Sequence, residues 1–354
     1  MSKYWSPAIK QLTPYVPGEQ PKQLDIVKLN TNENPYPPSP KVVEALHQFP
    51  AERLRLYSDP DSTALKQAIA DYHGIERSHV FVGNGSDEVL ALTFMAFFRQ
   101  ERPLLMPEIT YSFYDVYCNL YDIDFKLQPL QQDFSINLDD YQQPNGGIIF
   151  ANPNAPTGRA LELAEIEQLL QKNTESLVVV DEAYVDFGAE SAVELTARYD
   201  NVLVIQTLSK SRSLAGMRVG FAIGHPELID GLERVKNSFN SYPLDMLAVA
   251  TAVAAFEDDE YFRETTSKII ATREKACNEL AELGFESLPS KTNFLFTSHK
   301  SIPADELMSY LRSENIIVRH FSKPLIKNYL RITIGTESEM QLLIDTLKRH
   351  PQIG

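Results

Sequence analysis

The segment from Thr207 to Arg218 reads TLSKSRSLAGMR. Apolar runs at 202–205 and 219–223 flank it, so Lys210 closely follows a strand that we expect to be buried. A lysine side chain can carry its amine into a partly desolvated pocket, where the neutral, nucleophilic form becomes accessible. Arg218 offers a guanidinium fork that suits a phosphate group. On their own, these two residues could equally be solvated charges on a loop.

Two further apolar runs end in polar groups. The run 177–180 leads into Asp181-Glu182-Ala183-Tyr184, and the run 147–151 leads into NPNAPTG at 152–158. The spacing is 29 residues from Asn152 to Asp181 and again 29 from Asp181 to Lys210, enough for a crossover helix and a return strand. Open α/β sheets bind ligands at the carboxyl ends of their strands. The three polar segments are therefore expected at one edge of a sheet.

These motifs, in this order, resemble the pyridoxal-phosphate site of the fold-type I aminotransferases. The chain is similar above all to the histidinol-phosphate aminotransferases, through LNTNENPY at 29–36, YSDP at 57–60 and GNGSDE at 83–88. The motifs extend from about residue 15 to residue 335, nearly the whole chain. The resemblance implies an α/β fold, with a large domain whose mostly parallel seven-stranded sheet lies between helices, and a smaller α+β domain.

The expected domain boundaries follow from this resemblance and from changes along the chain. Residues 1–38 are rich in proline and polar groups and are expected to form an arm that contributes to the small domain and to a partner subunit. Ser39 and Pro40 then predict the start of a helix, as a capping residue and a proline at the first position. We expect the large cofactor-binding domain over 39–250, with a helix at 189–199, and the small domain over 251–354.

The resemblance assigns the cofactor contacts. Lys210 would form a Schiff base with pyridoxal 5'-phosphate and carry a proton, Asp181 would keep the pyridine nitrogen protonated, and Tyr184 and Asn152 would bind the phenolic oxygen. Tyr111 would stack on the ring, although it could be a core aromatic. The expected phosphate contacts are Ser86, Asp87, Thr207, Ser209, Arg218 and, from a partner subunit, Tyr57. Without the resemblance, the turn at 83–88 could be an ordinary strand-to-helix turn.

The resemblance also assigns substrate contacts, namely Tyr15, Asn152, Arg319 and Arg331. The two arginines would clamp an acidic group, although an arginine in an edge strand is often solvated or paired. The arm tyrosine could instead pack on an apolar surface. A series of aromatic side chains at helical spacing is better explained by core packing: Phe113, Tyr114, Tyr117 and Tyr121. Arg212 departs from the family pattern, and its position is not fixed by the sequence.

Composition narrows the classes of function. The net charge of −15 argues against a nucleic-acid surface but not against an anionic substrate, because a few converging arginines can make a positive pocket. Cys118 and Cys277 are far apart, which favours a reducing cytoplasm over a disulfide framework. No signal peptide, membrane span or metal-ligand spacing is evident in the sequence.

The sequence therefore predicts a homodimeric enzyme that acts on small molecules. The reaction favoured by the resemblance is amino transfer from L-histidinol phosphate to 2-oxoglutarate, a step of histidine synthesis. One alternative is an aromatic amino acid aminotransferase, since the same site can hold a ring and an anionic group. Another is a cofactor-dependent decarboxylase of a phosphorylated amino acid.

Overall fold

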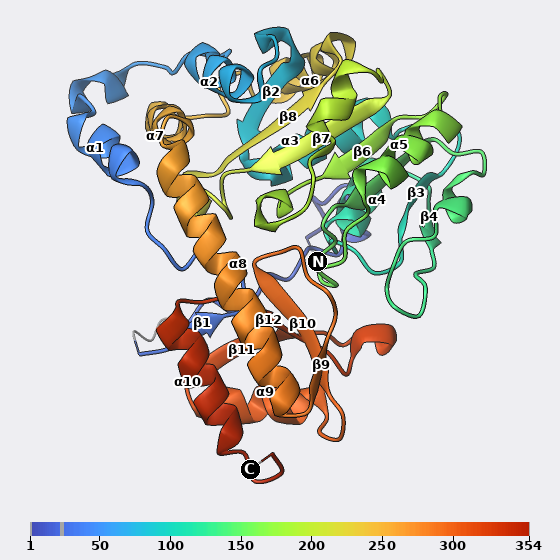
Figure 1. The fold of residues 1–354 in the computed structure, drawn as a ribbon. Coiled ribbons are helices and arrows are strands. Elements are labelled where there is room, and N and C mark those ends of the chain that lie inside the picture. The colour runs from blue at the N-terminus through green and yellow to red at the C-terminus, as the bar shows by residue number, and fades with distance from the viewer. Residues whose placement is uncertain (1, 22–24, 354) are drawn as a thin grey trace.

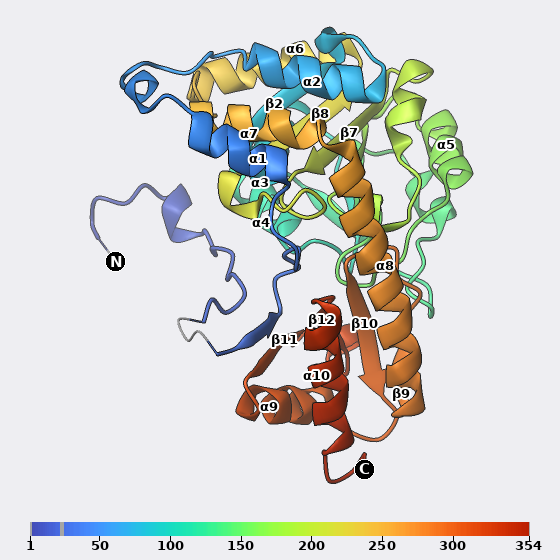
Figure 2. The same cartoon turned by 60° about the vertical axis from the view of Figure 1, so that its left-hand side comes forward.

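The computed structural model describes residues 2–21 and 25–353; residues 1 and 22–24 of the expected arm, and residue 354, lie outside the described residues. The chain forms two sheets, and the long helix α8 (Asp259–Glu282) runs from one to the other (Figures 1 and 2). Within the described residues, no helix is both long and apolar enough to cross a bilayer.

The large sheet has seven strands in the order β2-β8-β7-β6-β5-β3-β4. Its strands are β2 (Val80–Asn84), β3 (Leu104–Pro107), β4 (Phe125–Gln128), β5 (Gly147–Ala151), β6 (Val178–Asp181), β7 (Val202–Thr207) and β8 (Val219–Gly224). Strand β8 is antiparallel to both of its neighbours, β2 and β7, and the other neighbouring strands pair in parallel. The expected mostly parallel seven-stranded sheet is confirmed.

Helices cover both faces of this sheet because its central strands are apolar on both sides. In β6, Val178 and Val180 face one core and Val179 faces the other. The first core packs on α1 (Pro40–Gln48), α2 (Thr63–His73), α5 (Leu163–Lys172) and α7 (Met246–Phe256). The second packs on α3 (Gly85–Phe97), α4 (Tyr114–Tyr121) and α6 (Pro226–Phe239).

The small sheet has five strands in the order β1-β11-β12-β10-β9. They are β1 (Val27–Leu29), β9 (Phe285–Ser287), β10 (Phe294–His299), β11 (Ile316–His320) and β12 (Leu330–Thr333). The strands share an apolar core with α8, α9 (Ala304–Ser313) and α10 (Glu337–Lys348), which gives the expected α+β arrangement. Strand β1 comes from the N-terminal segment and pairs in parallel with β11.

One expected helix has a different form. Residues 189–199 contain only a short 3-10 helix, Ala192–Ala197. The buried Glu182 carboxylate accepts hydrogen bonds from the Ser191 hydroxyl and the Ala192 amide, both at 2.6 Å, and so fixes its start. The Thr196 hydroxyl donates back to the Val193 carbonyl at 2.7 Å within this short segment. Local hydroxyl and carboxylate bonds of this kind compete with a regular helix.

Candidate active site

A cavity of about 250 Å³, called here the inner cavity, lies at the carboxyl ends of β5, β6 and β7. Strand pairing aligns Ala151 with Asp181 and Asp181 with Ile205, so the polar residues that follow these strands meet there. Nine of the expected cofactor residues line the inner cavity: Ser86, Asp87, Tyr111, Asp181, Tyr184, Thr207, Ser209, Lys210 and Arg218.

One end of the inner cavity is suited to an anion. Helix α3 begins there at Gly85. The Asn84 side chain makes no cap, and the Glu88 carboxylate accepts from the Asn84 N–H at 2.6 Å, which leaves the N–H groups that follow available. Gly220 of β8 allows the close approach, because a Cβ at this position would lie 2.2 Å from the Ser86 nitrogen. Arg218 stands beside this turn and donates from Nη2 to Asp87 Oδ2 at 2.9 Å.

The Asp181 carboxylate lies at the end of β6 and is only 4% exposed. Burial raises the pKa of Asp181 to about 6, even though its oxygens accept hydrogen bonds. The donors are the Tyr114 hydroxyl, 2.8 Å from Oδ2, and the Ala183 amide, 3.2 Å from Oδ1. At neutral pH this site therefore holds a buried negative charge that can pair with a cation.

Lys210 extends its amine toward the N-terminal segment. Its Nζ donates to the Thr31 carbonyl at 3.2 Å and lies 5.7 Å from the centre of the Tyr184 ring. The loop of Lys210 is fixed by Asn34, whose Nδ2 donates to the Lys210 carbonyl at 3.0 Å. The Tyr184 hydroxyl accepts from Asn32 Nδ2 at 2.9 Å. Residues of the N-terminal segment therefore position both the amine and the phenol.

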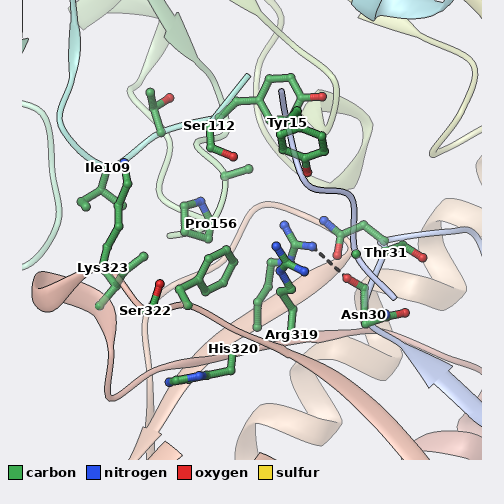
Figure 3. Close-up of a pocket in the computed structure, with 18 of the residues that line it drawn as sticks. Tyr15, Asn30, Thr31, Ile109, Ser112, Pro156, Arg319, His320, Ser322 and Lys323 are labelled. Atoms are coloured by element: carbon green, nitrogen blue, oxygen red, sulfur yellow. Dashed lines mark hydrogen bonds between the residues drawn. The ribbon is translucent and has the colours of Figure 1, made fainter. Parts of the chain in front are cut away.

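Figure 3 shows a second cavity, of about 310 Å³, called here the outer cavity. The two cavities share a set of lining residues, namely Thr31, Tyr111, Ala155, Tyr184 and Lys210. The outer cavity is lined by the expected substrate residues Tyr15, Arg319 and Arg331. Arg319 and Arg331 of the small sheet therefore line the same cavity as Lys210.

The two arginines of the outer cavity, Arg319 and Arg331, have no acidic partner in the described part of the chain. Among residues 2–21 and 25–353, neither guanidinium forms an ion pair with a carboxylate. Arg331 Nη2 donates to the Asn30 carbonyl at 2.9 Å, whereas its buried Nε has no partner within the described part of the chain. Burial, together with the nearby positive charge of Arg319, lowers the pKa of Arg331. This arrangement favours the binding of an anion.

His320, the neighbour of Arg319, takes no part in that arrangement. One of its ring nitrogens lies 2.7 Å from the Lys327 carbonyl, and Figure 3 shows the ring directed away from the Arg319 guanidinium. Lys323 lies on the other side of the cavity, near Ile109. No group of acidic, histidine or cysteine side chains in the described residues could hold a metal ion.

Two expected site residues are not brought to these cavities by the single chain. The Asn152 amide closes a ring with Leu161, accepting from its nitrogen at 2.7 Å and donating to its carbonyl at 3.2 Å. It lines a separate cavity of about 190 Å³, while Ala155 occupies the wall between the inner and outer cavities. Tyr57 is 83% exposed, lines neither cavity, and stacks on Tyr242 at a centroid distance of 4.9 Å.

The structure settles where Arg212 points. Its guanidinium is buried away from both cavities, within 4.1–4.8 Å of the ring centres of Tyr72, Phe256 and Phe262. Its Nη1 donates to the Ala255 carbonyl at 2.6 Å. Arg212 therefore links the Lys210 loop to α2, α7 and α8 and adds no charge to the inner cavity.

Sequence reasoning missed a second role of the aromatic series. Tyr114 and Tyr117 belong to the core, as expected, but their hydroxyls also reach the acidic residues of the inner cavity. Tyr111 donates to Asp87 Oδ1 at 3.0 Å, and Tyr117 donates to the Asp87 carbonyl at 2.7 Å. The signal in the sequence was the choice of tyrosine over phenylalanine at three-residue spacing, since a buried hydroxyl needs a partner.

Known proteins match the chain over nearly its full length. It is 59% identical to histidinol-phosphate aminotransferase 2 of Dechloromonas aromatica, covering 99% of each chain. It is 60% identical to a histidinol-phosphate aminotransferase of Acinetobacter baumannii, covering 98% of this chain and 97% of that one.

The fold also matches a solved structure. The crystal structure of histidinol-phosphate aminotransferase from Sinorhizobium meliloti in complex with pyridoxal-5'-phosphate has a TM-score of 0.88 and 25% identity, covering 100% of this chain and 98% of that one. A model of the family of class I and II aminotransferases matches residues 24–347. The chain belongs to the aminotransferase class I and II family.

Proposed function

We propose that the protein transfers the amino group of L-histidinol phosphate to 2-oxoglutarate, in histidine biosynthesis, with pyridoxal 5'-phosphate as its cofactor. The observation that carries the proposal is the pair Arg319 and Arg331, which have no acidic partner among the described residues and lie in a cavity that shares Lys210 with the inner cavity. The names of the relatives at about 59% identity point to the same substrate.

The residues of the inner cavity fit this cofactor. The uncapped start of α3, with Ser86, Ser209, Thr207 and Arg218, offers donors for a phosphate group. Tyr111 gives an aromatic wall, and the buried Asp181 carboxylate suits a protonated ring nitrogen. When bound, the cofactor supplies an electron sink and a carrier for the amino group.

The side chains of the protein then have separate tasks. Lys210 Nζ is the base that takes the proton from the substrate carbon bearing the amino group. Tyr184, whose hydroxyl accepts from Asn32, presents its ring 5.7 Å from that amine. Arg319 and Arg331 bind the substrate phosphate and so orient the reacting carbon toward Lys210. Tyr15 lines the same cavity and reduces the access of water.

The proposal extends to the assembly. Tyr57 of each chain would reach its partner's inner cavity in a homodimer. This is supported by its 83% exposure, by the exposed side chains of Leu54 and Leu56 just before it, and by the exposed Tyr242 that stacks on it. The two sheets with their separate cores support a division into a large domain, expected at 39–250, and a small domain, expected at 251–354, beside the arm at 1–38. Helix α7 packs on the core of the large sheet as far as Phe256, which favours a boundary after that residue. The free thiols Cys118 and Cys277 agree with a cytoplasmic location.

The test is a half-reaction with the cofactor-loaded protein. Histidinol phosphate, phenylalanine and phosphothreonine are added separately, the absorbance of the bound cofactor is followed, and the products are identified. We expect fast amino transfer with histidinol phosphate and slow transfer with phenylalanine. A preference for phenylalanine would assign the protein to aromatic transamination, and release of carbon dioxide from phosphothreonine would assign it to the decarboxylases.

A further inference from the structure

Three tyrosines spaced three residues apart surround the acidic side of the inner cavity. Tyr111 and Tyr117 both bond to Asp87, whereas Tyr114 alone bonds to Asp181. Tyr114 is the first residue of α4 and is fully buried. It reaches Asp181 from the core and not from the cavity, since it does not line either cavity.

The ring of Tyr114 is held in place by its neighbours. It makes an edge contact with Tyr111 at a centroid distance of 5.6 Å and lies 6.0 Å from Phe94. A ring fixed in this way directs its hydroxyl at Asp181 Oδ2, while the Ala183 amide holds Oδ1. The plane of the carboxylate is therefore defined by one donor on each oxygen, and each oxygen keeps a further lone pair for a ligand.

We propose that Tyr114 is a positioning residue for the cofactor, which keeps the Asp181 carboxylate ionised and aimed at the position of the pyridine nitrogen. This inference rests on the proposed function, because it requires a cofactor with such a nitrogen. The hydroxyl acts only through Asp181 and touches neither the cofactor nor the substrate.

The charges around Asp181 explain why such a donor is needed. Burial disfavours the ionised carboxylate, and the negative charge of Asp87 on α3 acts in the same direction. The Tyr114 hydroxyl and the Ala183 amide oppose both effects. Tyr114 itself stays protonated, because burial and the adjacent Asp181 raise its pKa well above the usual range. Removing its hydroxyl therefore raises the pKa of Asp181 above about 6.

The test measures the binding of pyridoxamine 5'-phosphate to the cofactor-free full-length protein at a series of pH values. This probe retains the ring nitrogen and the phosphate, but its amine replaces the aldehyde, so Lys210 cannot bind it covalently. An ionised Asp181 favours the complex, so the affinity of the native protein should fall as the pH drops below about 6. With Tyr114→Phe, the fall should begin about one pH unit higher or more.

Two controls separate this role from a general effect on the fold. Tyr141→Phe removes the hydroxyl of a buried tyrosine that lines neither cavity, and should leave the profile unchanged. In an Asp181→Asn background, adding Tyr114→Phe should change the affinity little, because the residue it acts through has lost its charge. Replacement of Tyr114 by 3-fluorotyrosine, a stronger hydrogen-bond donor, should move the fall in affinity to lower pH. This measurement does not require the Tyr114→Phe variant to fold.

The outcomes are distinct. A Tyr114→Phe profile that coincides with the native one, or an effect of equal size in the Asp181→Asn background, would overturn the role of Tyr114 while leaving the proposed function intact. A native protein that fails to bind the probe at any pH would overturn both.

Discussion

Replacement of Arg331 by glutamine should separate phosphate recognition from the rest of catalysis. The variant keeps a polar side chain, shorter than that of arginine, but loses the guanidinium charge that faces the outer cavity. A charge-assisted hydrogen bond contributes about 1.5–3 kcal/mol, and 1.4 kcal/mol corresponds to about a factor of ten. We therefore expect kcat/KM for histidinol phosphate to fall roughly 10- to 150-fold, mainly through KM.

The assay compares L-histidinol phosphate with L-histidinol, which lacks the phosphate. With histidinol, the native protein and Arg331→Gln should have similar kcat/KM values, because this substrate has no phosphate for Arg331 to bind. Arg349→Gln is the matched control, since Arg349 is an exposed arginine that pairs with Glu314 at 3.3 Å, away from both cavities. An equal loss of activity with both substrates would refute phosphate recognition by Arg331.

The same variant should have the opposite effect on the ligand-free protein. Burial and the charge of Arg319 lower the pKa of Arg331, which means that the surroundings disfavour its cationic form. Neutral glutamine should therefore leave the free energy of unfolding unchanged or raise it. Inorganic phosphate should raise the Tm of the native protein, and should raise that of the variant less.

Three further predictions concern assembly, the anion turn and acid stability. If Tyr57 completes the partner's site, then mixing the inactive variants Tyr57→Ala and Lys210→Ala under conditions of subunit exchange should restore roughly a quarter of native activity. Half of the dimers would then be mixed, and each mixed dimer has one complete site out of two. Failure to regain activity despite exchange would contradict shared sites. Gly220→Ala should weaken cofactor binding by at least about tenfold, because its Cβ would meet the Ser86 nitrogen at 2.2 Å. The affinity is measured by titration of the cofactor-free protein. Unchanged binding would show that the turn is not part of the phosphate site. Burial lowers the pKa of His73 to about 4, so the folded state binds fewer protons than the unfolded state in acid. The free energy of unfolding should therefore fall by up to about 3 kcal/mol between pH 6.5 and 4. In urea unfolding, His73→Gln should show a shallower pH dependence over this range.

The pattern of apolar runs predicted that the polar segments after three strands meet at one edge of a sheet, whereas the seven-stranded sheet and the other residues of the inner cavity were expected from the resemblance to the fold-type I aminotransferases. Apolar runs of four to six residues end in polar groups at Asp181 and shortly before Lys210. In a parallel sheet the carboxyl ends of neighbouring strands meet, so residues far apart in the chain can be placed together without knowledge of the loops. The observed register of β5, β6 and β7 agrees with this reasoning.

The sequence was a poorer guide where the direction of a loop side chain decides the contact. Asn152 follows β5 directly, yet its amide is used by the backbone of Leu161, and Ala155 reaches the cavity wall three residues later. Arg212 lies two residues from Lys210 and points the opposite way, into three aromatic rings from distant helices. Neither direction follows from local pattern, because each depends on partners far away in the chain.

The charges of the site show how a protein of net charge −15 can bind anions. Each acid that lines the inner cavity already has donors: Asp87 has Tyr111 and Arg218, Asp181 has Tyr114 and the Ala183 amide, and Glu33 has Lys28 and Thr31. The nearby cations Lys210, Arg319 and Arg331, in contrast, bond only to backbone carbonyls or to no described hydrogen-bond acceptor. Negative charge is therefore offset within the protein and positive charge is left for the ligand, so the local field opposes the net charge. The distribution of partners, and not the composition, decides which ligands this site can hold.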